Sequence, residues 1–295
     1  MTKTITKEDN LKGIFLMVLA VLILPFTDAI AKWLSSSYSI VQIAWLRFLL
    51  QATILFILAI VLKYRLTEFK KDYILSSLFI TLCIVFLFWG LKFLPLANNI
   101  ALFFVEPLFL TILSVVILKE KLQKNHIIAL IIGLIGTIII IRPNWSAYGM
   151  ASVLPILAAF SYALYLMSLK QILTATNAKS LQFYIGLIST FFLSIVMIVA
   201  EIVDFETFKY IQININHWWL IFILGVVTTI VQLLTSKAFY YSRVSSLASF
   251  QYLEIISASI LGWIIFNEVP DNLTITGALV VILSGLYLIR HERKS

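Results

Sequence analysis

The chain has 295 residues, of which 61% are hydrophobic and 12% are charged, and its mean hydropathy is +1.03. Soluble domains are about half apolar and about a quarter charged. The composition therefore excludes an ordinary water-soluble domain and favours a protein whose outer surface faces lipid. The single cysteine, Cys83, excludes a disulfide framework and a cysteine-based metal site.

Apolar segments follow one another along the whole chain. A membrane-spanning helix needs about 20 mostly apolar residues. We expect ten such helices, near residues 11–31, 39–62, 72–91, 96–118, 125–141, 149–169, 178–200, 217–238, 245–266 and 273–289. The sequence thus predicts an all-α polytopic membrane protein, with no segment left over for a soluble domain.

The first apolar segment follows a charged start, "MTKTITKEDNLKG", which is also how a secretory signal peptide begins. However, the segment has full spanning length, carries Asp28 and ends in "AKWLSSS". We therefore expect this segment to be retained as the first transmembrane helix rather than cleaved.

Lysine and arginine residues are distributed unevenly between the connections. If the N-terminus is cytoplasmic, seventeen of the 22 lie on the cytoplasmic side, four lie on the other side, and Arg47 lies within a span. Cytoplasmic connections of membrane proteins carry such an excess. We therefore expect both termini in the cytoplasm and a multi-pass location in a cell inner membrane. The same bias accounts for the net charge of +8, so no nucleic-acid partner is expected.

The two halves of the chain carry similar segments. The segment "FFVEPLFLTILSVVILKE" aligns without a gap with "QYLEIISASILGWIIFNE" of the second half. Glu106 then meets Glu254, and Glu120 meets Glu268. Both halves therefore carry two glutamates with the same spacing, one on an expected helix and one at its end.

Two further matches follow in the same order along the chain. With a slightly smaller displacement, "FTDAIA" aligns with "FSYALY" and "RF" aligns with "QF". We predict two five-helix repeats, residues 11–141 and 149–289. Because five is odd, the second repeat must enter the membrane inverted relative to the first. Secondary transporters use this layout, with a substrate site between the halves and alternating access.

Four ionisable residues fall inside the expected spans: Asp28, Arg47, Glu106 and Glu254. Such groups cost about 2.5 to 3.5 kcal/mol in hydrocarbon on insertion scales, so they usually face the bundle interior or a watery path. The two glutamates lie near mid-span on equivalent helices, which suits a site for a cationic or zwitterionic solute. The alternative is a structural pair in which Arg47 neutralises a carboxylate and fixes helix packing.

Other polar and aromatic residues accompany these charges. Helical spacing places Asn99 on the face of Glu106 and Gln251 on the face of Glu254. Most aromatic residues belong to the interface or the core, but some can hold a cation or a flat ring, each contributing about 0.5 to 2 kcal/mol. The aromatic candidates are Trp45, Tyr162 and Tyr252.

Pro107 lies inside the expected fourth helix, where a proline frees the carbonyl of Phe103 and can kink the helix. Ile255 occupies the matching place in the second half, so any kink should be confined to the first half. Glu120 and Glu268 follow the apolar segments. They are either solvated charges or repeated structural acceptors for the N-terminus of the following helix or a neighbouring loop.

These features together resemble a known superfamily. Two five-helix halves, "LRFLL" on the second helix, a glutamate closing helices four and nine, and "TITGALVVILSG" resemble the EamA-type ten-helix branch of the drug/metabolite transporter superfamily. The resemblance covers almost the entire chain. Ala129 stands where the second half has Gly277, so close packing in the first half is expected to use Gly133 and Gly136 instead.

Within this superfamily the chain is similar to the S-adenosylmethionine uptake transporters of obligate intracellular bacteria. This resemblance implies import of S-adenosylmethionine, alone or in exchange for S-adenosylhomocysteine. Glu106 and Glu254 would neutralise its sulfonium and ammonium groups, aromatic residues would hold its adenine, and Arg47 would bind its carboxylate. The 16 lysines against 6 arginines fit an AT-rich genome of the kind that such bacteria have.

Other classes of protein are disfavoured. No "GxxxxGK[ST]" phosphate loop occurs, which argues against intrinsic ATP use. The three histidines, His126, His217 and His291, lie at expected helix ends or in the tail, which disfavours a metal-dependent membrane enzyme. We expect no catalytic residue, metal or cofactor, and a small-molecule substrate. An amino-acid or drug exporter of the same fold is the alternative, while proton coupling and the oligomeric state stay open.

Overall fold

The computed structural model describes residues 6–90, 93–94, 99, 102–141, 149–173, 176–266 and 272–292. Within these residues the backbone forms helices and turns, and no β-strand. Glu268, Lys92 and Arg142 lie outside the described residues. The all-helical architecture that the composition predicts is therefore confirmed for the described part of the chain.

Helices account for most of the described chain, and all of them except α10 have at least 13 residues. They are α1 (Lys7–Leu34), α2 (Ile40–Val61), α3 (Asp72–Gly90), α5 (Glu106–Leu118), α6 (Lys124–Ile141), α7 (Val153–Ile172), α8 (Ala178–Ile202), α9 (Trp218–Tyr241), α10 (Val244–Ala248), α11 (Glu254–Phe266) and α12 (Asn272–Glu292). Short 3-10 turns are η2 (Gly149–Ser152), η3 (Glu206–Phe208), η4 (Ile215–His217) and η5 (Gln251–Leu253). Seven helical stretches are long and apolar enough to cross a membrane, and α5, α6 and α12 provide shorter apolar helices.

Polar side chains begin two of the long helices. Thr6 Oγ1 accepts a hydrogen bond from the backbone N–H of Asp9 at 3.1 Å at the start of α1. Asn177 Oδ1 accepts from the N–H of Ser180 at 2.8 Å at the start of α8. Each side chain satisfies a donor that the first helical turn leaves unpaired. The apolar residues that follow continue as helix because, in lipid, backbone polar groups must be satisfied internally.

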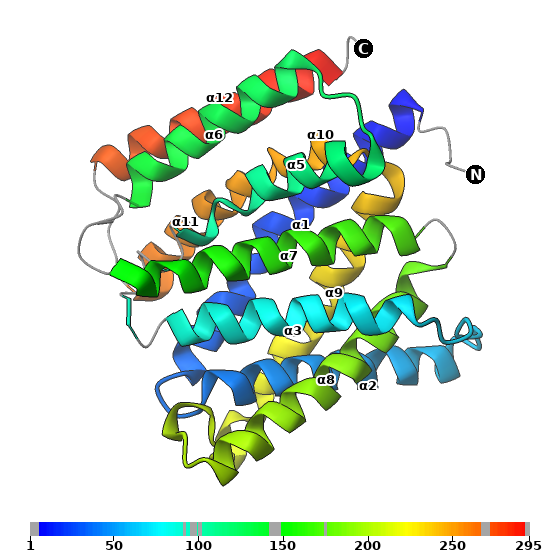
Figure 1. The fold of residues 1–295 in the computed structure, drawn as a ribbon, viewed down its shortest axis with the longest axis vertical. Coiled ribbons are helices and arrows are strands. Elements are labelled where there is room, and N and C mark those ends of the chain that lie inside the picture. The colour runs from blue at the N-terminus through cyan, green and yellow to red at the C-terminus, as the bar shows by residue number, and fades with distance from the viewer. Residues whose placement is uncertain are drawn as a thin grey trace.

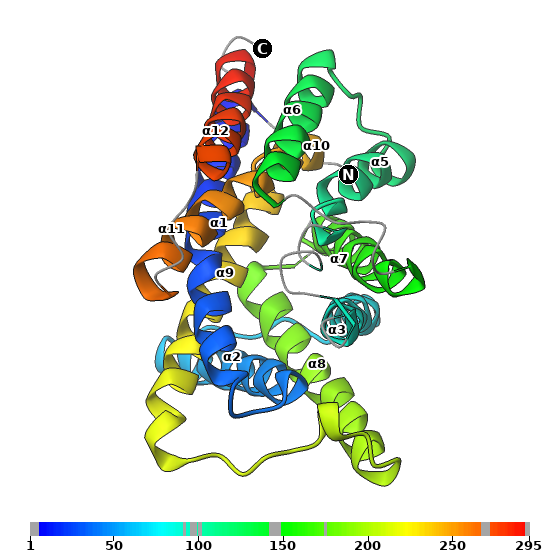
Figure 2. The ribbon, with the colours of Figure 1, turned by 90° about the vertical axis from the view of Figure 1, so that its left-hand side faces the viewer.

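The helices stack side by side in one assembly (Figures 1 and 2). The most extensive contacts join α6 with α12, α1 with α9, α3 with α7, and α2 with α8. Figure 1 shows α1 beginning and α12 ending on the same side of the assembly, which we call the termini side. The described chain is therefore a multi-pass helical bundle with both ends on one side.

The α6–α12 pair depends on small residues. A Cβ atom added to Gly136 would lie 2.9 Å from the carbonyl oxygen of Gly277. The side chain of Ser284 on α12 donates a hydrogen bond to the carbonyl of Ala129. Small residues allow such close approach of two helices in a membrane. The expectation that Gly136 provides close packing in the first half is confirmed.

Helix boundaries in the two halves correspond closely. The helices α5 and α11 each have 13 residues, and they start at Glu106 and Glu254, the two glutamates that the repeat aligns. The helices α6 and α12 begin at Lys124 and Asn272, which the same alignment places on each other. The repeat pairs α1 with α7, α3 with α9 and α5 with α11. The helix contacts follow this pairing, since α1–α9 corresponds to α7–α3 and α1–α11 corresponds to α7–α5. This is the pattern expected of two equivalent halves.

Neither Glu106 nor Glu254 lies inside an unbroken helix, contrary to the continuous spans expected at 96–118 and 245–266. The N–H of Val105 donates to the carbonyl of Leu102 at 3.4 Å, and the N–H of Leu253 donates to that of Phe250 at 3.1 Å. These two 3-10-type bonds occupy equivalent positions in the two halves, and each precedes a glutamate. A 3-10 stretch inside a helix often marks a functional hinge.

Pro107 does not cause this interruption. It lies at the beginning of α5, where the N–H that proline lacks would have no helical partner. The second half is interrupted at the matching place although Ile255 follows its glutamate. The prediction of a kink confined to the first half was therefore wrong. The interruption belongs to both halves.

Candidate functional site

Asp28 lies on the inward face of α1. The outward face carries exposed Leu22 and Phe26. Asp28 follows buried Met17 and Val21 by three and two helical turns, so it shares their face. Asp28 is nevertheless exposed. A carboxylate that is accessible on the packed face of a spanning helix indicates a polar opening beside α1 at this level.

Glu254 faces the same region from α11, which packs against α1. The Oγ atom of Ser257, one turn further along α11, donates to the carbonyl of Val21 at 3.3 Å. The carboxyl groups of Glu254 and Asp28 lie close enough to interact electrostatically. The start of a helix favours a negative group through the helix dipole. Two acidic groups therefore share this wall of the site.

Glu106 approaches from the start of α5 and is only 2% exposed. It lies close enough to Glu254 for the charges of the two glutamates to interact. The amide of Gln251 lies next to the Glu106 carboxyl, but Gln251 Nε2 and Glu106 Oε1 have no hydrogen-bond partner of normal geometry. Buried polar atoms without partners are rare and costly. The two side chains therefore lie against each other without a hydrogen bond of normal geometry.

Arg47 brings a positive charge to the site from α2. Its guanidinium interacts electrostatically with Asp28. Its Nε atom is buried and has no hydrogen-bond partner. A guanidinium can bind a carboxylate through two parallel hydrogen bonds. Arg47 therefore keeps bonding capacity that an internal ion pair would have used.

Aromatic rings form a second wall near the glutamates. The ring of Tyr162 on α7 packs against Phe103 and Tyr165, with centroids 5.8 and 5.7 Å apart. Tyr162 also interacts electrostatically with Glu106 and Glu254. An aromatic face beside carboxylates can hold a cation or stack on a planar ring. The sequence-predicted Tyr162 is thus brought to the acidic residues.

Three predicted site residues have other surroundings. Trp45 donates from Nε1 to Ser194 Oγ on α8 at 2.7 Å. Asn99 donates from Nδ2 to the carbonyl of Leu87 near the end of α3 at 2.9 Å, so its expected place on the face of Glu106 does not apply across the interruption. Tyr252 is buried against Gly133 of α6 and its hydroxyl has no partner, but like Tyr162 it interacts electrostatically with Glu106.

A buried amide network was not anticipated from the sequence. Gln51 Nε2 donates to the carbonyl and side-chain oxygens of Gln182 at 2.9 and 3.1 Å. Gln182 Nε2 donates to Ser236 Oγ at 2.7 Å and to Tyr165 Oη at 3.3 Å. Tyr165 Oη donates to Gln232 Oε1 at 3.0 Å. The match of "RF" with "QF" was the available signal, because it places Gln182 at the position equivalent to Arg47.

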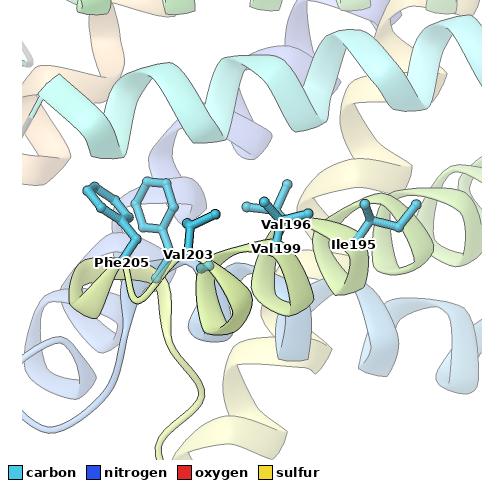
Figure 3. Close-up of a pocket in the computed structure, with 7 residues that line it drawn as sticks. Ile195, Val196, Val199, Val203 and Phe205 are labelled. Carbon is cyan, nitrogen blue, oxygen red and sulfur yellow. The ribbon is translucent and has the colours of Figure 1, made fainter.

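No group of three or more His, Cys, Asp or Glu residues that would hold a metal ion occurs among the described residues. A hollow near the end of α8 is lined only by apolar side chains (Figure 3). Its lining residues are Ile195, Val196, Val199, Ala200, Val203, Phe205 and Phe208. This hollow has no polar group for a charged solute and is separate from the site described above.

The α8–α9 connection lies on the side opposite the termini. Gln42 of α2 exchanges two hydrogen bonds with the backbone of Ile211, at 2.7 and 2.9 Å. At the surface, Lys209 pairs with Asp204 and Glu206 and lowers the pKa of Asp204 through its hydrogen bond and charge. Exposed pairs of this kind contribute little to stability. The connection therefore serves as a packed cover over α2.

The fold and the site together define a multi-pass membrane transporter, in which helices from both ends of the sequence bring polar groups to one interior region. The sequence model of the EamA-like transporter family matches residues 11–142 and 149–290, once in each half. The chain belongs to the EamA-like transporter family, as the resemblance to the drug/metabolite transporter superfamily predicted.

Curated relatives are transporters of different solutes. The chain is 26% identical over 292 residues to an S-adenosylmethionine uptake transporter of Rickettsia prowazekii, covering 98% of this chain and 96% of that protein. It is 24% identical over 288 residues to the pseudopaline exporter CntI of Pseudomonas aeruginosa, covering 97% and 99%. It is 29% identical over 208 residues to a riboflavin transporter of Vibrio cholerae, covering 70% and 67%.

A solved crystal structure has the same fold. It superposes with a TM-score of 0.80 over 97% of this chain and 98% of the other chain, at 14% sequence identity. At this identity the likeness concerns the arrangement of the helices alone.

Proposed function

We propose that the chain is a secondary transporter of ten spans, built from two inverted five-helix repeats, residues 11–141 and 149–289. Matching helix boundaries and the exchange of packing partners support the duplication. The lysine and arginine bias supports cytoplasmic termini in a cell inner membrane. The substrate moves by alternating access, as one half rocks against the other around a central site.

The observation that carries this proposal is the electrostatic interaction between Glu106 and Glu254. Both start a helix after a 3-10 turn, both come from equivalent positions, and their charges interact. Secondary transporters build midplane sites from such interrupted helices. Asp28 and Arg47 stand beside this pair and complete a set of three acidic groups and one guanidinium.

We assign the substrate-binding role to nine residues. Six of them interact with one another at the acidic site: Glu106, Glu254, Asp28, Arg47, Gln251 and Tyr162. Asn99, Tyr252 and Trp45 support the surrounding helices and contribute to the site through them. The set suits a zwitterionic solute that also carries a ring.

S-adenosylmethionine is the substrate that fits this set. Its sulfonium and ammonium groups would lie near Glu106 and Glu254, its carboxylate near Arg47, and its adenine against the ring of Tyr162. The relative from Rickettsia prowazekii, which spans nearly the whole chain, supports this choice. Exchange for S-adenosylhomocysteine would drive uptake without ATP, in keeping with the absence of a phosphate-binding loop.

The second candidate is export of an amino acid or another metabolite by the same fold. The pseudopaline exporter relative favours it, since it covers 97% of this chain at an identity close to that of the uptake transporter. The two candidates differ in the direction of net flux and in the solute. Transport in right-side-out and inside-out vesicles separates them.

Uptake of labelled S-adenosylmethionine into a bacterium without its own uptake system tests the proposal. We expect uptake by the wild-type chain, faster when the cells are preloaded with S-adenosylhomocysteine, and none by the combined Glu106→Gln and Glu254→Gln variant. Glu201→Gln, which alters an exposed carboxylate at the end of α8, is the matched control. No uptake by wild type would exclude this substrate, and undiminished uptake by the double variant would exclude the site.

A further inference from the structure

Glu120 joins two parts of the chain that are distant in sequence. It follows α5, after Lys119, which adopts a left-handed conformation with φ of 54° and ends the helix. Glu120 Oε1 accepts from the N–H of Val244, and Oε2 accepts from the N–H of Ser245, both at 3.0 Å. The expectation that Glu120 accepts from the N-terminus of the following helix was wrong. Glu120 does accept from a helix N-terminus, but the helix is α10 of the other half.

This contact is strong for its type. A carboxylate that receives a hydrogen bond on each oxygen from backbone N–H groups makes charge-assisted bonds. The positive end of the helix dipole favours the same negative charge. Because α10 has only five residues, few hydrogen bonds of its own fix its position. Its placement therefore depends on what its ends contact.

The α1 helix holds the same junction from another direction. Asn10 Oδ1 accepts hydrogen bonds from the hydroxyl of Ser242 and from the N–H of Arg243, the latter at 3.3 Å. Gly13 lies so close to Ser242 that an added Cβ atom would collide with it. The start of α10 is thus enclosed by residues of the first half.

The enclosed junction leads directly to the candidate site. From Val244 the chain passes through α10 and the 3-10 turn η5, reaches Gln251 within that turn and then starts α11 at Glu254. A movement of α10 about η5 would change access to these residues without disrupting α11. A 3-10 turn between two helical segments is suited to such a hinge.

We propose that Glu120 is a positioning residue that closes the transport path at the termini side by holding the start of α10. Release of its carboxylate from Val244 and Ser245 lets α10 turn about η5, so that the site opens toward this side. The inference rests on the proposed alternating-access function and specifies the contact that controls one of its two openings. A cap that only stabilised α10 would leave the accessible side unchanged.

Accessibility of a buried position to a thiol reagent distinguishes these two roles. Ser249 lies between α10 and η5, is 3% exposed, and its Oγ has no hydrogen-bond partner. Cys83→Ser removes the only natural cysteine, and Ser249→Cys then supplies a single reporter. A membrane-impermeant maleimide is added from the termini side, in vesicles without substrate, so that the readout does not require the correct substrate.

We expect Glu120→Gln to increase the labelling rate at this reporter about tenfold, which corresponds to about 1.4 kcal/mol of shifted equilibrium. Glutamine replaces one acceptor oxygen by an NH₂ group, which cannot accept from a backbone N–H. Glu120→Asp keeps the charge with a shorter side chain and should give an intermediate rate. Glu201→Gln should label like the unmodified reporter protein.

Val244→Pro tests the same contact from the donor side. Proline removes the N–H that donates to Glu120 Oε1 yet is well tolerated at the first position of a helix. The preceding Arg243 has φ of −72° and ψ of 145°, which is compatible with a following proline. This variant should also accelerate labelling, and its effect should not add to that of Glu120→Gln, because both remove one interaction.

Equal labelling rates in the Glu120 and Val244 variants and the parent would overturn the proposal, provided each variant elutes as a monodisperse protein. The Val244 variant keeps the question testable if Glu120→Gln fails to fold. Accelerated labelling without S-adenosylmethionine transport would retain the gate and reject the substrate. Normal transport with unchanged labelling would reject the gate and retain the substrate.

Discussion

Two pairs of residues occupy equivalent positions in the two halves but differ in charge. We call Asp28 and Arg47 the charged wall, and Tyr162 and Gln182 the neutral wall. The matches of "FTDAIA" with "FSYALY" and of "RF" with "QF" place Asp28 on Tyr162 and Arg47 on Gln182. Asp28 and Arg47 interact with each other, and Arg47 keeps an unpartnered Nε. Gln182, in contrast, is buried in a network of hydrogen bonds. One wall is charged and has an unpartnered Arg47 Nε, whereas the other is neutral and mostly hydrogen-bonded, with Gln51 Oε1 left without a partner.

This difference in charge indicates that the two walls have different roles, one in helix packing and one in binding the substrate. The two walls lie on equivalent helix pairs, since the contact of α1 with α11 corresponds to that of α7 with α5. A neutral network with satisfied hydrogen bonds rigidifies the packing of helices. Charges inside a membrane are costly and are retained where they serve a solute. We infer that the neutral wall fixes the bundle and the charged wall selects the polar end of the substrate.

The largest expected effect comes from Glu106 and Glu254, one from each half of the chain. Combined Glu106→Gln and Glu254→Gln should lower the uptake of S-adenosylmethionine about 100-fold or more, because two charge-assisted contacts are lost, each contributing about 1.5 to 3 kcal/mol. Initial uptake rates at equal protein amounts in the membrane measure this. A loss below about threefold would contradict a shared acidic site.

The next largest effect is expected at Arg47, where a substitution removes the difference in charge between the two walls. Arg47→Gln gives the charged wall the residue of the neutral one, and should raise the KM for S-adenosylmethionine about tenfold through the lost bond to the substrate carboxylate. Arg47→Lys should lie between the two, since lysine keeps the charge without the bidentate geometry. Decarboxylated S-adenosylmethionine should be transported equally by all three proteins, and a matching loss for this analogue would contradict the assignment.

A smaller effect is expected at Gln182 and tests whether the neutral wall stabilises the fold. Gln182→Ala removes the side-chain hydrogen bonds to Ser236, Tyr165 and Gln51, although Gln51 keeps its bond to the backbone carbonyl, and should lower the free energy of unfolding by about 1 to 3 kcal/mol. The apparent melting temperature in detergent measures this change. The KM for S-adenosylmethionine should change less than about twofold, since a tenfold change would require about 1.4 kcal/mol of substrate binding. A large KM change at unchanged melting temperature would place Gln182 in direct contact with substrate.

The smallest effect concerns Trp45. Trp45→Phe removes the hydrogen bond from Nε1 to Ser194 Oγ and should lower stability by about 1 kcal/mol, while the KM stays unchanged. Ser194→Ala should give a similar loss, and the double variant should not add the two. Additive losses would show that Trp45 acts elsewhere than on α8.

Much of the fold was predictable because the bilayer imposes simple requirements. Uninterrupted apolar segments predicted the helices, and most of the described boundaries lie within a few residues of the expected ranges. The repeat predicted that Glu106 and Glu254 occupy equivalent positions. Ionisable residues are rare in such segments, so Asp28 and Arg47 were also visible as candidates.

Other features gave no usable pattern. A 3-10 turn has nearly the same apolar composition as the helix that it interrupts, so the breaks before Glu106 and Glu254 did not alter the hydrophobic segment. Asn99 seemed to share a face with Glu106 only because an unbroken helix was assumed. Amide residues such as Gln182 carry no charge to mark them, and their partners come from three other helices.

The sequence by itself determined the membrane-spanning helices, the equivalent glutamates and the family, because these depend on hydrophobicity, spacing and local composition. Only the tertiary structure decided that the charges of the two glutamates interact, that Arg47 and Gln182 have different surroundings, and that Glu120 accepts hydrogen bonds from α10. These outcomes depend on contacts between segments that are far apart in the sequence, which no local pattern encodes.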